Sequence, residues 1–402
     1  MGAWSLFLSI ATILETGKGG LIKNALIKFI NSSERNDHAK IETASILINL
    51  FVTLISGVVI LTAAPTLGAY WDIAELDTML YWYVGTLVLL IPFSHFEYIQ
   101  QAHHSFSGIL SSYLVRQGTL FALIVATVFL PPQEHYLRNL VIFQTIGVAG
   151  GAVVGYRYAR QFIAKQWAYS KEWVRKLWGY GKFVFATSLS SLVFRSTDQI
   201  MVASYISTAA VALYNVSIRV TNLMDIPSTV ASEVMFPKSV KISSENDDKR
   251  TKYMYEKSVG IILAFMLPVS VFIMVFPEEV IRLIASEKYL DATELLQITI
   301  VYSLFLPFLK QFGTTMDATG RPNINFLLIF ALAVLNIISN YGFIQYFGLP
   351  GAAYGTLFTY VVSFIANQLI LHRVFKVSTW KIFRQIPITY QDTVSYVRNM
   401  SK

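Results

Sequence analysis

Long apolar blocks alternate along the chain with short polar connections. Many of these blocks reach 20 residues or more, and about 20 apolar residues coiled as a helix match the hydrocarbon thickness of a bilayer. The helices predicted from this pattern lie near residues 3–30, 41–64, 77–98, 107–131, 138–160, 179–205, 207–236, 252–276, 290–316, 323–347 and 350–376. We therefore expect an all-α integral membrane protein with about eleven transmembrane helices.

Composition supports the same class. Hydrophobic residues make up 54% of the chain and charged residues 14%, whereas a soluble domain carries about 25% charged residues. The absence of cysteine excludes disulfides and thiolate chemistry. The adjacent His103 and His104 point in different directions on a helix, so we interpret them as interfacial polar residues rather than metal ligands. We expect neither a metal nor a cofactor.

Lys and Arg fall almost entirely on one side of the predicted topology. Twenty-six of them lie in or beside connections on that side, including Arg116 and Lys310, whereas the other side carries only Arg138, Arg282 and Lys288. Basic loops of membrane proteins face the cytoplasm. The net charge of +8 therefore reflects membrane topology, and we expect no nucleic-acid partner.

This orientation has a consequence for the start of the chain. The first predicted helix runs from outside to inside, which leaves the N-terminus outside without a signal peptide to carry it there. Either a short N-terminus was translocated unaided, or a helix that once preceded Met1 is missing.

A basic and aromatic connection divides the predicted helices into two groups. Residues 157–183 mix both residue types at helical spacing, which is typical of an amphipathic helix in the anionic headgroup layer. The tail is similar, and it is either a second membrane-surface anchor or an ordinary juxtamembrane segment. The expected parts are an N-terminal lobe at 1–160, a linker at 161–178, a C-terminal lobe at 179–376 and a basic cytoplasmic tail at 377–402.

Glycine spacing predicts close helix contacts. Gly147, Gly151 and Gly155 repeat every fourth residue, as do Gly351 and Gly355. Small residues at this spacing allow helix backbones to approach each other in membranes. We also expect Pro307, inside a predicted span, to free a backbone carbonyl and permit bending.

Several short motifs resemble one transporter family. They are R-x-x-D at 195–198, ALYN at 212–215, FPK at 236–238, MDATGRPNI at 316–324 and GLPGAAYGTLFTYVV at 348–362. Together they resemble Wzx-type polysaccharide (O-antigen) flippases of the multidrug/oligosaccharidyl-lipid/polysaccharide exporter superfamily. The opening GAWSLFLSIATI resembles the second helix of that family, so the resemblance also implies that the first helix is absent.

The resemblance implies a fold and a function. The expected fold has two six-helix lobes around a central cavity, with both termini cytoplasmic. The expected function is transport of undecaprenyl-diphosphate-linked oligosaccharide across the bacterial inner membrane by alternating access, for polysaccharide, O-antigen or lipopolysaccharide biosynthesis. Membrane lipids surround such a multi-pass protein, and a coupling ion, either a proton or sodium, would bias the cycle.

Four charged residues are predicted near one depth in the membrane. Arg195 lies about 15 Å and Arg219 about 18 Å below the outer ends of their helices, and Glu15 and Lys18 lie about 18 and 22 Å deep. An ionised group at mid-bilayer costs roughly 2.5–3.5 kcal/mol and therefore normally faces a cavity or a partner. We predict that Arg195, Arg219 and Lys18 bind the substrate diphosphate, because cationic donors suit phosphate oxygens.

The acidic residues leave several roles open. Asp198 and Glu15 would either face the cavity and bind the coupling ion, or form local ion pairs with Arg195 and Lys18 three residues away. Asp225 and Glu233 are predicted closer to the cytoplasm, where they would form an inner gate or ion pairs at the rim.

Catalysis has no support in the sequence. It contains neither a phosphate-binding P-loop nor H-E-x-x-H, and the longest predicted outer loops, near 65–77 and 277–290, are too short for a membrane polymerase or ligase. A non-transporting scaffold would not require charges at one depth in both lobes. The alternative that remains is a small-molecule or drug antiporter of the same fold, which should have an acidic cation site in its N-terminal lobe and an apolar cavity.

Overall fold

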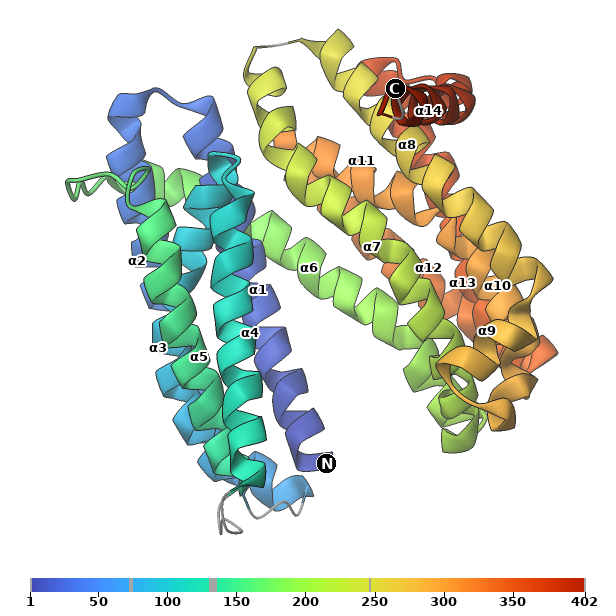
Figure 1. Ribbon diagram of the computed structural model, residues 1–402, viewed down its shortest axis with the longest axis horizontal. Helices are drawn as coiled ribbons and strands as arrows, with labels where there is room; N and C mark the ends of the chain where they lie inside the picture. The colour runs from blue at the N-terminus through green and yellow to red at the C-terminus, as the bar shows by residue number, and fades with distance from the viewer. Residues whose placement is uncertain (1, 72–74, 130–135, 246, 401–402) are drawn as a thin grey trace. The chain divides into compact units, whose positions relative to one another are not determined.

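The computed structural model describes residues 2–71, 75–129, 136–245 and 247–400, and these residues form mostly long helices (Figure 1). Contacts divide the chain into two compact units, Met1–Ser188 and Leu189–Lys402. The N-terminal unit contains α1 (Gly2–Ser32), α2 (Arg35–Trp71), α3 (Leu76–Ala102), α4 (Phe106–Val128), α5 (Tyr136–Ala159) and the first half of α6 (Lys171–Tyr205). Residues 72–74 of the predicted outer loop at 65–77 lie outside the described residues.

The C-terminal unit begins in the second half of α6 and contains the remaining helices. They are α7 (Thr208–Ser244), α8 (Asp248–Val275), α9 (Pro277–Ile284), the 3₁₀ helix η1 (Glu287–Ala292), α10 (Thr293–Ser303), α11 (Leu306–Ala318), α12 (Pro322–Phe347), α13 (Leu349–Phe375) and α14 (Thr379–Met400). The all-α class predicted from the apolar blocks is confirmed.

Eight helical segments within the described residues are long and apolar enough to cross a membrane. The chain is therefore a multi-pass membrane protein. Three further predicted spans, α1, α6 and α7, are not among the eight. These helices carry Glu15, Arg195, Asp198 and Arg219 within them, and each charge lowers the mean hydropathy. The total of eleven spans stays a prediction.

Two predicted helices have different boundaries in the structure. The span expected at 290–316 is divided into α10 and α11 around Leu304 and Phe305. Pro307 stands at the start of α11, where its missing N–H and its ring would disrupt a continuous helix. The amphipathic helix expected over 161–178 is wrong in its first half, because residues 160–170 form turns and irregular chain and α6 begins only at Lys171.

This irregular connection is held by side chains of α2. The Glu42 carboxylate accepts hydrogen bonds from the backbone N–H of Ala164, at 3.0 and 3.2 Å, and the Thr43 hydroxyl accepts one from Ala168 at 3.1 Å. These bonds give backbone donors the partners that a helix would have supplied. The segment is therefore fixed against the N-terminal unit instead of forming an independent helix.

The glycine repeats lie at tight helix contacts, as predicted. A Cβ added to Gly147 would lie 2.5 Å from the carbonyl oxygen of Arg116 on α4, and one added to Gly151 would lie 2.9 Å from that of Ser112. Helices α4 and α5 therefore approach backbone to backbone. In the other repeat, a Cβ on Gly351 would collide with the backbone of Phe343 on α12.

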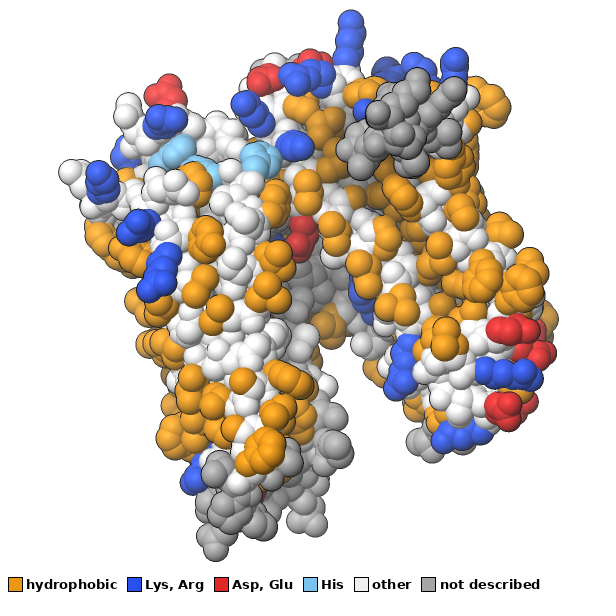
Figure 2. Space-filling model, viewed as in Figure 1, with side chains coloured by type: hydrophobic (Ala, Val, Ile, Leu, Met, Phe, Trp, Pro, Cys, Tyr) orange, Lys and Arg blue, Asp and Glu red, His pale blue; other side chains and the backbone are white. Residues whose placement is uncertain are grey.

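Hydrophobic side chains cover the flanks of the helices in both units, and charged side chains lie mainly at the ends of the helices (Figure 2). Each unit also has its own apolar core, built around Tyr83 in the N-terminal unit and Tyr214 in the C-terminal unit. Exposed apolar flanks suit a hydrocarbon environment, in which burial against lipid replaces burial against protein.

The tail forms an amphipathic helix on α8. Ile382 of α14 is fully buried, and the Tyr390 hydroxyl donates a hydrogen bond to the carbonyl oxygen of Ala264. Trp380 and Phe383 are exposed on the other face. The membrane-anchor interpretation of this face stays a prediction.

Candidate functional site

The central feature of the C-terminal unit is one carboxylate shared by two cations. Asp225 on α7 has its Oδ2 atom 3.3 Å from the Arg195 guanidinium of α6 and 3.3 Å from the Lys310 ammonium of α11. The Thr229 hydroxyl donates to the same oxygen at 3.5 Å. The second carboxylate oxygen of Asp225 is buried and makes no hydrogen bond. Two positive charges on one negative charge leave this Asp225 cluster with a net charge of +1.

Helix direction explains why Arg195 meets Asp225 instead of its neighbour in sequence. Side chains on a helix lean towards its N-terminus. Helices α6 and α7 are joined by the short turn at Ser207 and run in opposite directions. The Arg195 side chain therefore leans towards the start of α6, and the Asp225 side chain leans the opposite way, towards the start of α7, so the two side chains approach each other. The alternative of a local ion pair between Arg195 and Asp198 is therefore wrong. The placement of Asp225 closer to the cytoplasm stays a prediction.

The cluster remains accessible to a ligand. The Arg195 side chain is 57% exposed and the Lys310 side chain 29%, whereas Asp225 is only 12% exposed. Arg195 contacts Asp225 through a single nitrogen, and a guanidinium has five N–H donors. Donors of both cations are therefore free to bind an anion beside Asp225.

Lys310 was missed as a site residue because it was assigned to the cytoplasmic surface. A usable signal was present, since apolar residues surround it in SLFLPFLKQF at 303–312. Arg116, in the N-terminal unit, was missed in the same way. It lies ten residues into α4, which corresponds to a depth of about 15 Å.

Asp198 lies in a separate, fully protein-lined environment. It is 5% exposed and accepts hydrogen bonds from three neutral groups: the Tyr214 hydroxyl at 2.6 Å, the Thr356 hydroxyl at 2.8 Å and the Asn340 amide at 2.5 Å. Asn336 donates in turn to Thr356 at 3.0 Å. Neither Lys nor Arg from the described residues is paired with Asp198. We call these five residues the Asp198 cage.

The Asp198 cage contains unused acceptors. The side-chain carbonyl oxygens of Asn336 and Asn340 are buried and have no hydrogen-bond partner, and such groups are costly to bury. Together with the Asp198 carboxylate they form a set of oxygen atoms without a balancing positive charge. Oxygen sets of this kind suit a hard cation or a proton.

The N-terminal unit pairs its predicted residues differently from expectation. The Glu15 carboxylate is 3.4 Å from the Arg116 guanidinium and accepts a hydrogen bond from the Tyr83 hydroxyl at 3.2 Å. Lys18 is 6% exposed and donates to the Thr53 hydroxyl at 2.8 Å. The local ion pair between Glu15 and Lys18 is therefore wrong. Each side chain instead joins α1 to another helix of the unit.

Arg219 and Glu233 are both exposed on α7. Arg219 forms no ion pair or hydrogen bond with any described residue, and its predicted contact with substrate stays a prediction. Glu233 lies two helical turns beyond Asp225 towards the predicted cytoplasmic end. Its predicted role at an inner gate or rim likewise stays a prediction.

The Glu15–Arg116 pair provides a first test of the N-terminal unit. We expect Arg116→Ala to lower the free energy of unfolding by about 1–3 kcal/mol, because it leaves the partly buried Glu15 carboxylate without its cation. Glu15 is 30% exposed, which keeps the effect below that of a fully buried pair. Thermal unfolding in detergent measures it. Adding Glu15→Gln should recover most of the loss, and strictly additive losses would contradict the pairing.

Comparison with known proteins decides the family. The model of a family described as "Polysaccharide biosynthesis protein" matches residues 1–294. The chain belongs to this family. The match extends through α6 and α7, which carry Arg195 and Asp225. The family and the fold class expected from the motifs are confirmed.

Two curated relatives from archaea are similar over part of their length. An uncharacterised membrane protein of Methanocaldococcus jannaschii is 28% identical over 52% of the chain and 44% of its own length. The probable low-salt glycan biosynthesis flippase Agl15 of Haloferax volcanii is 22% identical over 46% of the chain and 39% of its own length. The aligned regions thus span less than half of either relative.

Solved transporter structures share the fold. A MATE crystal structure in the bent conformation superposes with a TM-score of 0.81 at 14% identity, covering 93% of this chain and 87% of the other. A MOP superfamily transporter from Pyrococcus furiosus, described as having a binding pocket of reversed polarity, superposes with a TM-score of 0.79 at 13% identity, covering 94% and 88%. At these identities the likeness establishes the fold alone.

Proposed function

We propose that the chain is a flippase for lipid-linked oligosaccharide, carried on an isoprenoid diphosphate such as undecaprenyl diphosphate. It would work by alternating access in the cytoplasmic membrane and serve polysaccharide or O-antigen export. The observation that carries this proposal is the Asp225 cluster, in which Arg195 and Lys310 share one carboxylate within membrane helices. It is supported by membership of a polysaccharide biosynthesis family.

A diphosphate fits the chemistry of this cluster. Guanidinium and ammonium donors form short, charge-assisted hydrogen bonds with phosphate oxygens, and a guanidinium can engage two oxygens at once. The net positive charge offsets the desolvation of an anion within the membrane helices. Arg219, exposed on α7, would add a further cation. Lys18 is buried in this structure, so its contribution would require another conformation of the N-terminal unit.

Asp225 would act as an internal competitor for the bound anion. Its carboxylate occupies one direction of approach to both cations, so an incoming diphosphate would displace it partly. Release of substrate would allow the carboxylate to return. A carboxylate in this position would prevent substrate from binding so tightly that the cycle stops.

Asp198 would bind the coupling ion in this scheme. Its environment contains three neutral donors and two unused amide oxygens, so a proton or sodium would balance the charge. A ligand shifts a conformational equilibrium only if it binds the two states differently. Because the Asp198 cage joins α6, α7, α12 and α13, relative movement of these helices would change its affinity. Glu15, which is already paired with Arg116, is the weaker candidate.

The alternative is an antiporter for small molecules or drugs. It is favoured by the similarity to a multidrug resistance MATE transporter, with a TM-score of 0.80 at 14% identity. Glu15 supplies the acidic group that such a protein would require in the N-terminal unit. Against this alternative, that carboxylate is neutralised by Arg116, and the Asp225 cluster is cationic. Organic cations would be repelled there.

Reconstitution distinguishes the two functions. We expect proteoliposomes containing the full chain to move a fluorescent isoprenoid-diphosphate oligosaccharide between leaflets, with the rate depending on a proton or sodium gradient. A membrane-impermeant quencher measures the exposed fraction. A lipophilic cationic dye should be neither transported nor inhibitory. Gradient-driven dye export without movement of the oligosaccharide would support the antiporter and contradict the flippase.

A further inference from the structure

A stripe of polar side chains is buried inside the N-terminal unit. Its members are four residues of α2, each 5% exposed or less: Glu42, Ser45, Asn49 and Thr53. Their spacing places them on one face of the helix, and from Glu42 to Thr53 they extend about 16 Å along its axis. We call these four residues the α2 stripe. It lies in the interior of the unit and not on a surface that faces lipid.

The α2 stripe ends at the buried amine of Lys18. Lys18, on α1, donates a hydrogen bond from Nζ to the Thr53 hydroxyl at 2.8 Å. Further along the same face of α2, Ile60 and Ala64 are apolar and belong to the core of the unit. Polar groups therefore occupy only the half of this face that begins at Glu42, and the basic residues of the preceding connection predict that this half is cytoplasmic.

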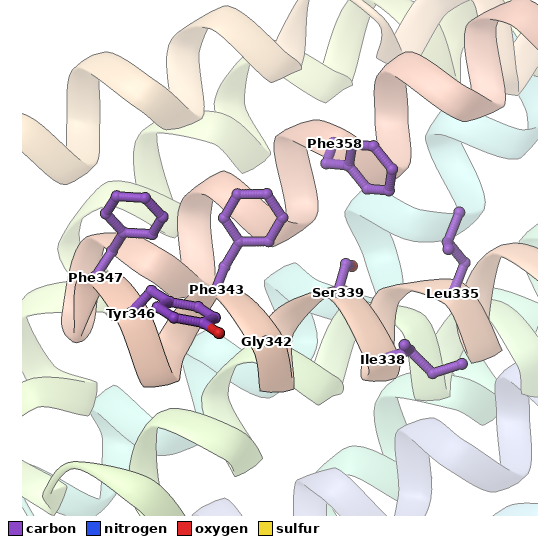
Figure 3. A pocket seen from close by; sticks show the side chains of 8 residues that line it. All are labelled: Leu335, Ile338, Ser339, Gly342, Phe343, Tyr346, Phe347 and Phe358. Carbon is purple, nitrogen blue, oxygen red and sulfur yellow. The ribbon is translucent and has the colours of Figure 1, made fainter.

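The C-terminal unit shows that the fold does not require such a polar stripe. Glu256 of α8 accepts a hydrogen bond from the backbone N–H of Ser378 at 2.8 Å, much as Glu42 holds the connection after α5. Three and seven residues after Glu256, however, the buried side chains are Val259 and Leu263. The pocket beside α12 and α13 is also lined mainly by apolar side chains, among them Phe343, Phe347 and Phe358 (Figure 3). The polar stripe is thus a particular feature of α2.

Several polar atoms along the α2 stripe have no partner among the described residues. They are the Ser45 hydroxyl, the side-chain oxygen of Asn49 and, on α3, the Nε2 atom of His95. His95 Nε2 lies 3.9 Å from the Glu42 carboxylate, and the Asn49 amide donates to Ser94 of α3 at 3.3 Å. Unpaired polar atoms are costly to bury, so helix association alone does not explain them. Buried water satisfies such atoms where two or more of them lie close together.

We propose that the α2 stripe is a proton path between the cytoplasmic side and Lys18. The Glu42 carboxylate takes up a proton, and water molecules held by the unpaired atoms pass it on by exchange of O–H and N–H bonds. The Lys18 amine receives the proton and becomes an ammonium ion, and release follows the reverse route. Ionisable groups inside a membrane protein commonly form proton relays. The proposal rests on the proposed flippase function and adds to it a second titrating group besides Asp198.

The charged groups at both ends suit this transfer. Near Lys18 lies Glu15 of α1, whose carboxylate is already bonded to Arg116 of α4 and Tyr83 of α3. A proton that reaches Lys18 therefore adds a net charge to the unit, and a conformational equilibrium responds to a ligand that binds its two states differently. At the other end, the titratable and charged groups around Glu42 are His95 and His103 of α3, with His38, His104 and Arg35 close to His103.

Single cysteines test for water in the α2 stripe. The chain has no cysteine of its own, so Ser45→Cys supplies one thiol, and Ala44→Cys supplies an equally buried one on another face of α2. Both variants in nanodiscs would be treated with Ag⁺, which reaches a thiolate through water, and the remaining thiols would be counted with a maleimide after unfolding. We expect Ser45→Cys to react about tenfold faster. Equal rates, fast or slow, would overturn the proposal. If Ser45→Cys does not accumulate, Asn49→Cys repeats the measurement one turn deeper.

Transport measurements test whether the path carries the coupling proton. In the proteoliposome assay, we expect Asn49→Leu to lower the ratio of pH-gradient-driven to gradient-free transport about tenfold, because it removes one hydrogen-bonding position from the path. Ile48→Leu, a conservative change at the adjacent buried residue, should leave this ratio unchanged. An unchanged ratio in Asn49→Leu, or transport that responds to a sodium gradient but not to a pH gradient, would overturn the proposal. If Asn49→Leu does not accumulate, the cysteine measurement decides.

Failure of the proton path and failure of the flippase function give different results. Transport of the isoprenoid-diphosphate oligosaccharide with equal reaction of the two cysteines would contradict the path and preserve the function. Selective reaction of Ser45→Cys without transport would preserve the water-filled path and contradict the function.

Discussion

Removing both cations of the Asp225 cluster should abolish transport. We expect Arg195→Ala and Lys310→Ala each to lower the transport rate by roughly 10- to 100-fold, because a hydrogen bond to a charged group contributes about 1.5–3 kcal/mol. The double variant should be inactive in the proteoliposome assay. Arg195→Lys should be partly active, since an ammonium keeps the charge but loses the planar fork.

Two further variants separate binding from folding in this cluster. Lys249→Ala removes an exposed cation elsewhere in the C-terminal unit and should leave transport unchanged. Asp225→Asn should strengthen binding of an isoprenoid diphosphate and slow its release, because the competing carboxylate is gone. If the double variant inserts, unfolds at the normal temperature and still transports, the diphosphate site is elsewhere. If it does not accumulate, Arg195 and Lys310 serve structure.

Replacing Asp198 should uncouple transport from the ion gradient. We expect Asp198→Asn to lower gradient-driven transport by up to about 100-fold, the equivalent of losing one hydrogen-bonded charge. Exchange of substrate without a gradient should persist, because Arg195 and Lys310 are untouched. The measurement compares initial rates with and without an imposed proton or sodium gradient.

An exposed carboxylate supplies the control for Asp198. Glu278→Gln on α9 removes the same charge at a side chain that is 57% exposed, and it should not change gradient dependence. Normal coupling in Asp198→Asn would contradict the ion-binding role. Loss of binding and of coupling together would show that the Asp198 cage maintains the fold of the C-terminal unit rather than carrying an ion.

The local ion pairs that the sequence left open as an alternative fail for a common geometric reason. Spacing along one helix suggested that Arg195 would meet Asp198 and that Glu15 would meet Lys18. In the structure each of these four side chains contacts a different helix instead. A buried charge can be compensated by any neighbouring helix, and local spacing does not say which one is nearest.

The sequence by itself determined the class and the approximate helices, and it singled out the principal charges within them. Apolar blocks matched to bilayer thickness require helices, because unpaired backbone groups cannot be exposed to lipid, and charges such as Arg195 and Asp198 then stand out against the apolar background. Tertiary structure alone decided the partners. It brought Lys310 from a distant helix to Asp225 and enclosed Asp198 with Tyr214, Asn340 and Thr356, because helix direction and packing set which side chains face each other.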